Sequence, residues 1–133
     1  MKITADSNIL LRAIVGDHPA QAKLAEDVLR RAEIVAVTTP VLCEVVWVLS
    51  QGYKIATTDI SQAIRELTNS ANVVVDRLAV DAGLAMLDAG GDFADGAIAF
   101  EGQRLGGDVF VSFDKHAVKL LEQQGVSVRL LAT

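Results

Sequence analysis

Three aspartates and one glutamate stand where an α/β protein places functional groups. Asp6 follows the apolar segment "KITA" and Asp114 follows "DVFVSF", so each is expected at the carboxyl end of a strand. Asp95 lies at a helix start in "GGDFADGAIAF", and Glu44 lies in the first turns of the helix after "TTP". Because like charges repel, carboxylates that converge without basic partners need protons or divalent cations. Hard oxygen ligands of this kind suit Mg²⁺, with Mn²⁺ as a substitute.

Glu44 raises a question of its own, because its helix is otherwise apolar. In "TTPVLCEVVWVLSQ", residues 38–51, it is the only charge, and no lysine or arginine lies within one helical turn. Thr38 or Thr39 can cap this helix, and Pro40 suits its first position. A helix that is apolar on all sides is normally buried, and a buried carboxylate is costly unless it is paired or binds a cation. We expect Glu44 to face a metal pocket, the alternative being a salt-bridged core residue.

The other acids also have a purely structural interpretation. Asp6 and Asp114 can cap the helices that follow them, and Asp92 is interpreted mainly as a cap that has a minor chance of touching the site. Asp95, in the first turn, can favour the helix dipole. Taken together these interpretations weaken, because no matching set of bases accompanies the acids.

The composition indicates an ordered globular protein with one domain over residues 1–133. A net charge of −5 argues against a protein that holds nucleic acid by bulk attraction alone. Cys43 is the only cysteine, so the chain can form neither an internal disulfide nor a zinc cluster of thiolates. The apolar stretches are too short for a membrane span and no signal-peptide pattern is present, so we expect a cytoplasmic protein without membrane contact.

Short apolar segments alternate with helical patterns along the chain. Strands are predicted at 2–5, 33–37, 72–75, 108–113 and 126–131, and helices at 7–15, 19–32, 40–51, 57–70, 77–89, from 92 onward and 115–124. Such alternation indicates βαβ units and therefore a mostly parallel central sheet of about five strands in a three-layer α/β/α fold. In such sheets function gathers at the carboxyl ends of the strands. The glycine-rich motifs of dinucleotide-binding and P-loop proteins are missing from the sequence.

With these motifs in this order, the chain resembles the PIN-domain ribonucleases, and among them the VapC toxins of bacterial and archaeal toxin–antitoxin pairs. The matching motifs are "ADSN" after the first strand, a glutamate shortly after "TTP", then "DFADGAIA" and "VSFDKHAVKL". The resemblance spans essentially the whole chain. It implies a catalytic and metal-binding quartet made of Asp6, Glu44, Asp95 and Asp114.

Residues beside the quartet receive supporting roles from the same resemblance. Ser7 and Ser112 stand at hydroxyl positions where Thr is commoner, next to the first and last acids, and Asn8 is expected to brace the first loop. Gly96 follows the third acid where a better helix former is usual, so we expect a looser helix start there.

The activity implied is that of a Mg²⁺-dependent endoribonuclease. One or two metal ions would bind the scissile phosphate and lower the pKa of a water that attacks phosphorus. Asp6 and Asp95 are expected as the main ligands, with Glu44 and Asp114 completing the site directly or through water. The resemblance also implies a homodimer and a VapB-like antitoxin whose C-terminal segment covers the acidic pocket.

Basic residues are spread thinly along the chain, and two that are close in sequence to the first and last acids are the better candidates for substrate contact. These two, Arg12 and Lys115, are expected to guide RNA phosphates. With so few cations, specificity is expected to come from RNA shape and from one or two exposed bases. His18 and His116 are interpreted as surface residues, although the latter lies two residues past the last acid.

Three other functions remain open from the sequence. A PIN-domain nuclease of RNA processing or decay, acting without an antitoxin, would use the same quartet. A phosphatase or receiver-like α/β domain would need a D-x-D after the first strand, whereas Asp6 is followed by Ser7 and Asn8. A non-catalytic binding module that keeps the fold is disfavoured by the intact quartet.

Overall fold

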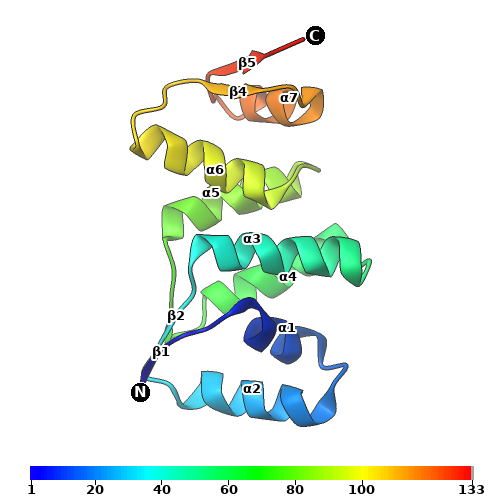
Figure 1. Cartoon of the computed structure of the whole chain (residues 1–133), viewed down its shortest axis with the longest axis vertical. Helices are drawn as coiled ribbons and strands as arrows, with labels where there is room; N and C mark the ends of the chain where they lie inside the picture. The colour runs from blue at the N-terminus through cyan, green and yellow to red at the C-terminus, as the bar shows by residue number, and fades with distance from the viewer. Residues whose placement is uncertain (133) are drawn as a thin grey trace. The chain divides into compact units, whose positions relative to one another are not determined.

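The computed structural model describes residues 1–132 and leaves Thr133 outside. These residues form two compact units, one over Met1–Asp76 and one from Arg77 onward. In both units short strands alternate with helices (Figure 1), and every strand pairing is parallel. The predicted α/β class with a parallel arrangement of strands is therefore confirmed. Within residues 1–132, no helix has the length and apolar character that crossing a membrane requires.

The first unit contains a three-stranded sheet and four α-helices. The strands are β1 (Lys2–Thr4), β2 (Ile34–Ala36) and β3 (Val73–Val74), paired in the order β1-β2-β3. The helices are α1 (Ser7–Val15), α2 (Pro19–Arg31), α3 (Thr39–Trp47) and α4 (Thr57–Thr68), and a π-helical turn η1 (Val48–Gly52) continues α3. Val35 is fully buried in the middle strand, where its neighbours in register are Ile3 and Val73.

Helix ends in this unit follow local chemistry. Asp6 caps α1 because its side chain accepts a hydrogen bond from the Ile9 N–H at 3.0 Å. Gly16 ends the same helix with φ +70°, a left-handed conformation that glycine adopts without strain. His18 caps α2 through Nδ1, which accepts from the Gln21 N–H at 3.3 Å, and a proline follows at the first helical position.

Helix α3 does not match the prediction of a helix buried on all sides. Leu42 and Val45 are fully buried, but Pro40, Glu44 and Trp47 are exposed, and Trp47 keeps 61% of its surface accessible. The three exposed residues recur at helical spacing, so they form one open face. The apolar composition of the segment concealed this face.

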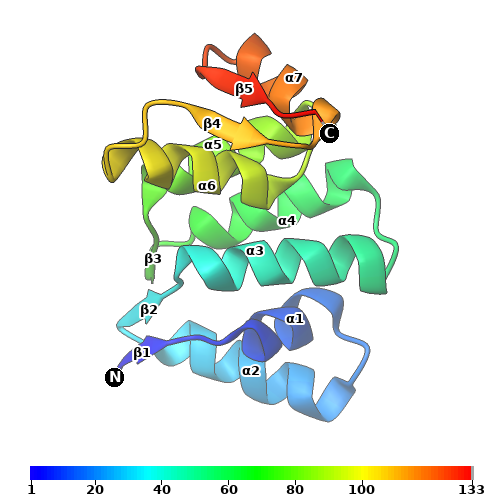
Figure 2. The ribbon, with the colours of Figure 1, turned by 45° about the horizontal axis from the view of Figure 1, so that its top comes forward.

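The second unit contains a two-stranded sheet and three helices. The strands are β4 (Phe110–Ser112) and β5 (Val128–Leu130), and the helices are α5 (Arg77–Asp88), α6 (Phe93–Arg104) and α7 (Lys115–Gln123). Met86, Leu120 and Leu121 belong to its core, and Phe110 packs against them. Five strands were predicted, and the described residues contain five, divided as three and two between the units (Figure 2).

Helices α5 and α6 approach each other closely because of two glycines. A Cβ at Gly83 would lie 2.6 Å from the ring of Phe93, which is fully buried. A Cβ at Gly96 would overlap the carbonyl oxygen of Ala82. Gly96 therefore brings the start of α6 against the backbone of α5, whereas the sequence had suggested only a loosened helix start.

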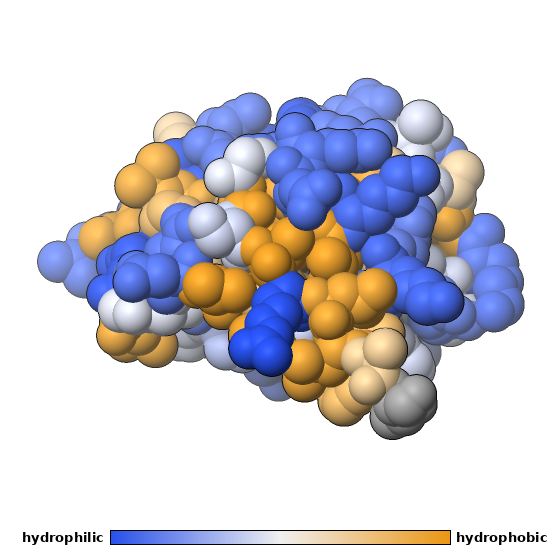
Figure 3. All heavy atoms as spheres, turned by 90° about the horizontal axis from the view of Figure 1, so that it is seen from above, coloured by the Kyte–Doolittle hydropathy of each residue, from blue (hydrophilic) through white to orange (hydrophobic). Residues whose placement is uncertain are grey.

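One face of β4 presents apolar side chains to solvent. Val109, Val111 and Phe113 alternate along this strand and its ends, and they keep 49%, 51% and 65% of their surfaces exposed. Apolar atoms are visible on the surface viewed from above (Figure 3). The opposite face of the strand carries Phe110, which packs into the core of the unit.

Candidate functional site

Asp6 is an exposed acid whose orientation is fixed by its capping role. Its Oδ1 accepts from the Ile9 N–H, and Oδ2 has no partner in the described part of the chain. Ser7 follows as the first residue of α1 and is buried, whereas Asn8 is exposed. The carboxylate is thus tethered by one oxygen and keeps the other for a ligand.

Asp114 is held in the same manner at the carboxyl end of β4. Its Oδ1 accepts from the N–H groups of His116 and Ala117 at 3.0 and 3.1 Å, which caps α7. The Ser112 Oγ accepts from the Asp114 N–H at 3.0 Å. The hydroxyl expected beside the last acid therefore contacts the backbone of that acid and steadies the turn from strand to helix.

Asp95 is half-buried in the first turn of α6, and its electrostatic environment is unfavourable for a charge. Burial raises the pKa of this carboxyl from its ordinary value of 3.8, and the negative charges of Asp92 and Asp114 raise it further. Asp92 caps α6 by accepting from the Ala94 N–H at 3.1 Å. Three carboxylates of the second unit thus repel one another at the position of Asp95.

Glu44 is exposed on the open face of α3 and forms no ion pair with any residue from 1 to 132. The alternative of a salt-bridged core residue is therefore wrong. The cost of burial that the sequence suggested for this carboxylate does not arise either, because water reaches it.

The four acids of the predicted quartet are divided between the units. Asp6 and Glu44 belong to the first, and Asp95 and Asp114 to the second. Across residues 1–132, no three His, Cys, Asp or Glu side chains form a group that could hold a metal ion. The donor chemistry nevertheless suits a hard divalent cation, since the acids offer carboxylate oxygens without basic partners.

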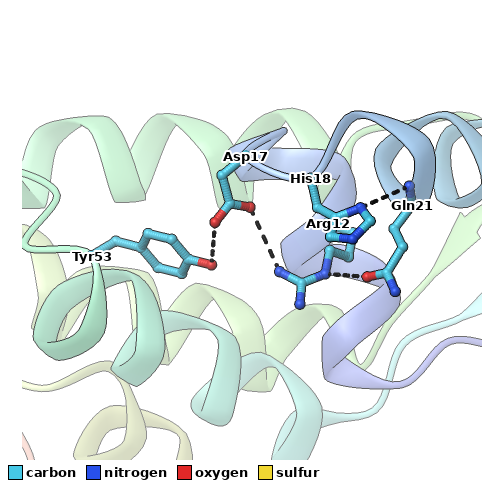
Figure 4. Close-up of polar contacts among 5 residues, drawn as sticks. All are labelled: Arg12, Asp17, His18, Gln21 and Tyr53. Atoms are coloured by element: carbon cyan, nitrogen blue, oxygen red, sulfur yellow. Dashed lines mark hydrogen bonds and ion pairs between the residues drawn. The ribbon is translucent and has the colours of Figure 1, made fainter.

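Arg12 is engaged with protein groups in the first unit (Figure 4). Its Nε donates to Gln21 Oε1 at 2.6 Å, and its Nη1 lies 3.6 Å from Asp17 Oδ1. Asp17 Oδ2 accepts from the hydroxyl of Tyr53 at 3.1 Å. The guanidinium expected to steer phosphates is therefore oriented by two neighbours, while Lys115, the other expected cation, is exposed at the start of α7.

Both histidines have structural partners. His18 caps α2, and the His116 Nε2 donates to the carbonyl oxygen of Gly90 at 3.0 Å, linking the start of α7 to the loop before α6. Both side chains are exposed, as the sequence interpretation expected.

A hollow between α1 and α2 was missed by sequence reasoning. It measures about 420 Å³ and is lined by Asn8, Ile9, Arg12, Gln21, Leu24 and Ala25. The spacing of Asn8 and Arg12 on one helix, and of Gln21 and Ala25 on the next, could have placed each pair on one helical face. The contact between these two faces depends on tertiary packing, which no local pattern in the sequence indicates.

The parallel strands and the acids at their ends indicate the class of protein. Parallel strands that end in helix-capping carboxylates, with further acids at helix starts, are the framework of an α/β protein that works at strand ends. The model of the PIN domain family matches residues 3–121, so the chain belongs to the PIN domain family. No curated protein and no solved structure matches the chain. PIN domains are generally nucleases, usually with divalent metals, and the fold is accordingly a nuclease fold.

Proposed function

We propose that this chain is a metal-dependent endoribonuclease and the toxin of a VapBC-type toxin–antitoxin pair. The observation that carries the proposal is the match to the PIN domain family over residues 3–121. Asp95 supports it, because this half-buried carboxylate has a pKa raised by burial and by Asp92 and Asp114. A fold without function at this place would gain stability by replacing one of these acids. A divalent cation instead offsets their repulsion.

The quartet of Asp6, Glu44, Asp95 and Asp114 would hold Mg²⁺ or, in its place, Mn²⁺. When bound, the ion supplies charge neutralisation at the phosphate and a lowered pKa for a bound water.

The protein's own contribution is to keep these carboxylates ready. Asp6 and Asp114 each use one oxygen to cap a helix, so neither must be ordered when a ligand arrives. The Ser112 hydroxyl steadies Asp114 by accepting a hydrogen bond from the backbone N–H of Asp114. Gly96 fixes the helix that carries Asp95 by its close approach to α5.

RNA is the proposed substrate, and Lys115 is the exposed cation best placed in sequence to meet a phosphate beside Asp114. A VapB-like antitoxin, a homodimer and a cytoplasmic location belong to the same proposal. A PIN nuclease of RNA processing or decay is the alternative, and a neighbouring reading frame for a small DNA-binding antitoxin would distinguish the two. A non-catalytic α/β binding module is the alternative from another class.

Cleavage of RNA by purified variants tests the proposal. Asp6→Ala and Asp95→Ala should abolish Mg²⁺-dependent cleavage while the protein stays folded, because each loses a carboxylate from a set without bases. Asp59→Ala is the matched control, since it removes an exposed acid in the first turn of α4. Undiminished cleavage by either test variant would show that the site is wrongly assigned, and absence of cleavage by the wild type would favour the binding module.

Sequencing of RNA 5′ ends after induced expression would identify the target. The Asp6→Asn protein provides the background, because it keeps the shape of the side chain and a cap for α1 while the charge is lost. New 5′ ends that appear with the wild type alone mark the cleaved bonds.

A further inference from the structure

The hollow between α1 and α2 has a polar side and an apolar side. Asn8, Arg12 and Gln21 supply amide and guanidinium groups, and the remaining lining comes from the apolar residues Ile9, Leu24 and Ala25. Its volume of about 420 Å³ lies within the range of sites that take small organic groups. Leu24 keeps 67% of its surface exposed, so the apolar side is open to a ligand.

The polar side is oriented in advance. Because every nitrogen of arginine is a donor, the Gln21 atom that faces Arg12 Nε at 2.6 Å must be the amide oxygen. The Gln21 NH₂ group therefore remains a donor, and it has no partner among residues 1–132, like Arg12 Nη2 and the Asn8 amide. Figure 4 shows the NH₂ groups of Arg12 and Gln21 turned to the same side of the bond between them.

Arg12 Nη2 and the Gln21 NH₂ are two donors on one side of the hollow, and they suit a ligand edge that carries two acceptors. Guanine offers such an edge in O6 and N7. The apolar side chains suit the flat face of a base, and the amide of Asn8 can pair with a further edge. A bare phosphate fits less well, because Asp17 already lies 3.6 Å from Arg12 Nη1 and offsets its charge.

The hollow also lies next to a proposed catalytic acid. Asp6 caps the helix whose second and sixth residues are Asn8 and Arg12. At 1.5 Å per residue, Arg12 lies about 9 Å along the helix axis from Asp6. A base in the hollow would thus belong to a nucleotide close to the phosphate handled at Asp6.

We propose that the hollow between α1 and α2 binds one unpaired guanine of single-stranded RNA, held by Arg12 and Gln21. The inference rests on the proposed ribonuclease function and adds a specificity site to it. Asp17 and Tyr53 act as positioning residues, since they orient Arg12 and do not line the hollow.

Binding of labelled RNA heptamers in EDTA, where cleavage is suppressed, tests this inference. The four heptamers are adenine chains with guanine, adenine, cytosine or uracil at the centre, and fluorescence anisotropy gives each Kd. The wild type should bind the guanine heptamer about tenfold tighter than the others, the size expected for one doubly hydrogen-bonded base. Gln21→Ala should reduce this preference to less than twofold, because a donor is lost and Arg12 loses its guide.

Gln62→Ala is the matched control, since it removes an exposed glutamine side chain from α4, away from the hollow. It should keep the full preference for guanine. Thermal melts show that each variant is folded, and titration of the wild type with guanosine monophosphate, followed by NMR, should shift amides of α1 and α2.

The outcomes separate this inference from the proposed function. Guanine preference without cleavage of any RNA in Mg²⁺ supports the hollow as a base site and contradicts the nuclease. Cleavage that depends on Asp6, together with equal binding of all four heptamers, supports the nuclease and overturns the guanine site. A preference for guanine that survives Gln21→Ala also overturns the guanine site. The hollow would then be a candidate surface for a protein partner instead.

Discussion

Two helix pairs, α1–α2 in the first unit and α5–α6 in the second, show opposite ways of packing. The first pair leaves a hollow of about 420 Å³ with donors of Arg12 and Gln21 on its wall. The second pair has no room for a single added carbon at Gly83 or Gly96. One pair is built to admit a ligand, and the other is built to hold a carboxylate in place.

The difference follows from what each pair must position. Asp95 stands next to Gly96, and its half-buried charge is repelled by two neighbouring acids, so the helix that carries it needs a firm attachment. Around the hollow, firmness comes instead from polar contacts at its loop end, where Asp17 bridges Arg12 and Tyr53. Tight apolar packing holds the helices of one pair in place, and hydrogen bonds at the loop end hold those of the other, where a hollow remains between the helices.

The largest loss of stability is expected when the tight pair of helices, α5 and α6, is forced apart. Gly96→Ala should lower the free energy of unfolding by about 3 kcal/mol, because the added methyl group meets the backbone of Ala82, which cannot move aside like a flexible side chain. Gly102→Ala, in the same helix with open space around it, should instead add up to about 1 kcal/mol. Urea unfolding measures both, and equal effects would contradict the packing described here.

A smaller loss should follow when the brace of the open pair is removed. Asp17→Ala should cost about 1 kcal/mol of unfolding free energy, because Tyr53 loses its acceptor and Arg12 loses an exposed ion pair. Asp17→Asn, which keeps an acceptor for the hydroxyl, should lose less. Thermal and urea unfolding of the two proteins give the difference, and an Asp17→Ala protein as stable as wild type would show that the brace is not formed.

The pH dependence of stability reports the electrostatic environment of Asp95. The pKa of Asp95 is raised in the folded protein, so the folded state binds its proton more tightly than the unfolded chain. Without metal, stability should fall as the pH rises from about 3.8, the ordinary value, through the raised pKa. Asp95→Asn should remove this fall and be the more stable protein at neutral pH.

The difference in unfolding free energy between wild type and Asp95→Asn should disappear below a pH of about 3.8, where the wild-type carboxyl is protonated in both the folded and the unfolded state. Its size is limited because Asp95 is half-exposed and solvent screens the charge. Urea unfolding in EDTA across the acid range measures it. A wild type that is the more stable protein at neutral pH would mean that Asp95 has a favourable partner.

The smallest effect on stability is expected at Glu44. Glu44→Gln should leave the free energy of unfolding in EDTA within about 0.5 kcal/mol of wild type, because the side chain is exposed and has no ion pair among the described residues. Metal affinity and RNA cleavage should both fall, since an amide is a poorer ligand for Mg²⁺. Melts in EDTA and in Mg²⁺ test both statements; a loss of about 3–5 kcal/mol would instead indicate a broken buried ion pair.

Local chemistry made most of the element boundaries predictable. Asp6 and Asp114 announce helix starts because a carboxylate after a strand can accept the free N–H groups of the next turn, and both do so. The predicted helix over 7–15 matches α1, and the strands differ from the predicted ranges only at their ends. The division of five strands into three and two depends on pairing between distant segments, which local patterns do not encode.

Properties that depend on tertiary contacts were not predictable in the same way. The sequence predicted Gly96 to be a weak point of its helix. Its actual role is to allow the close approach of Ala82 from another helix, which the sequence does not indicate. The exposure of Glu44 and Trp47 was hidden by the apolar residues around them. Arg12 read as a free cation, since neither of its partners, Asp17 and Gln21, is signalled by spacing within one helix.

The glycine contacts between α5 and α6 also have a genetic consequence. Every missense change at Gly96 introduces a Cβ, so no codon exchange that alters this residue can preserve the contact with Ala82. Under the proposed toxin function, a screen for variants that no longer arrest growth should therefore return changes at Gly83 and Gly96 as well as at the acids. Gly102, six residues further along α6, should not appear. Inactivating substitutions would then occur at packing glycines as well as at the proposed catalytic acids.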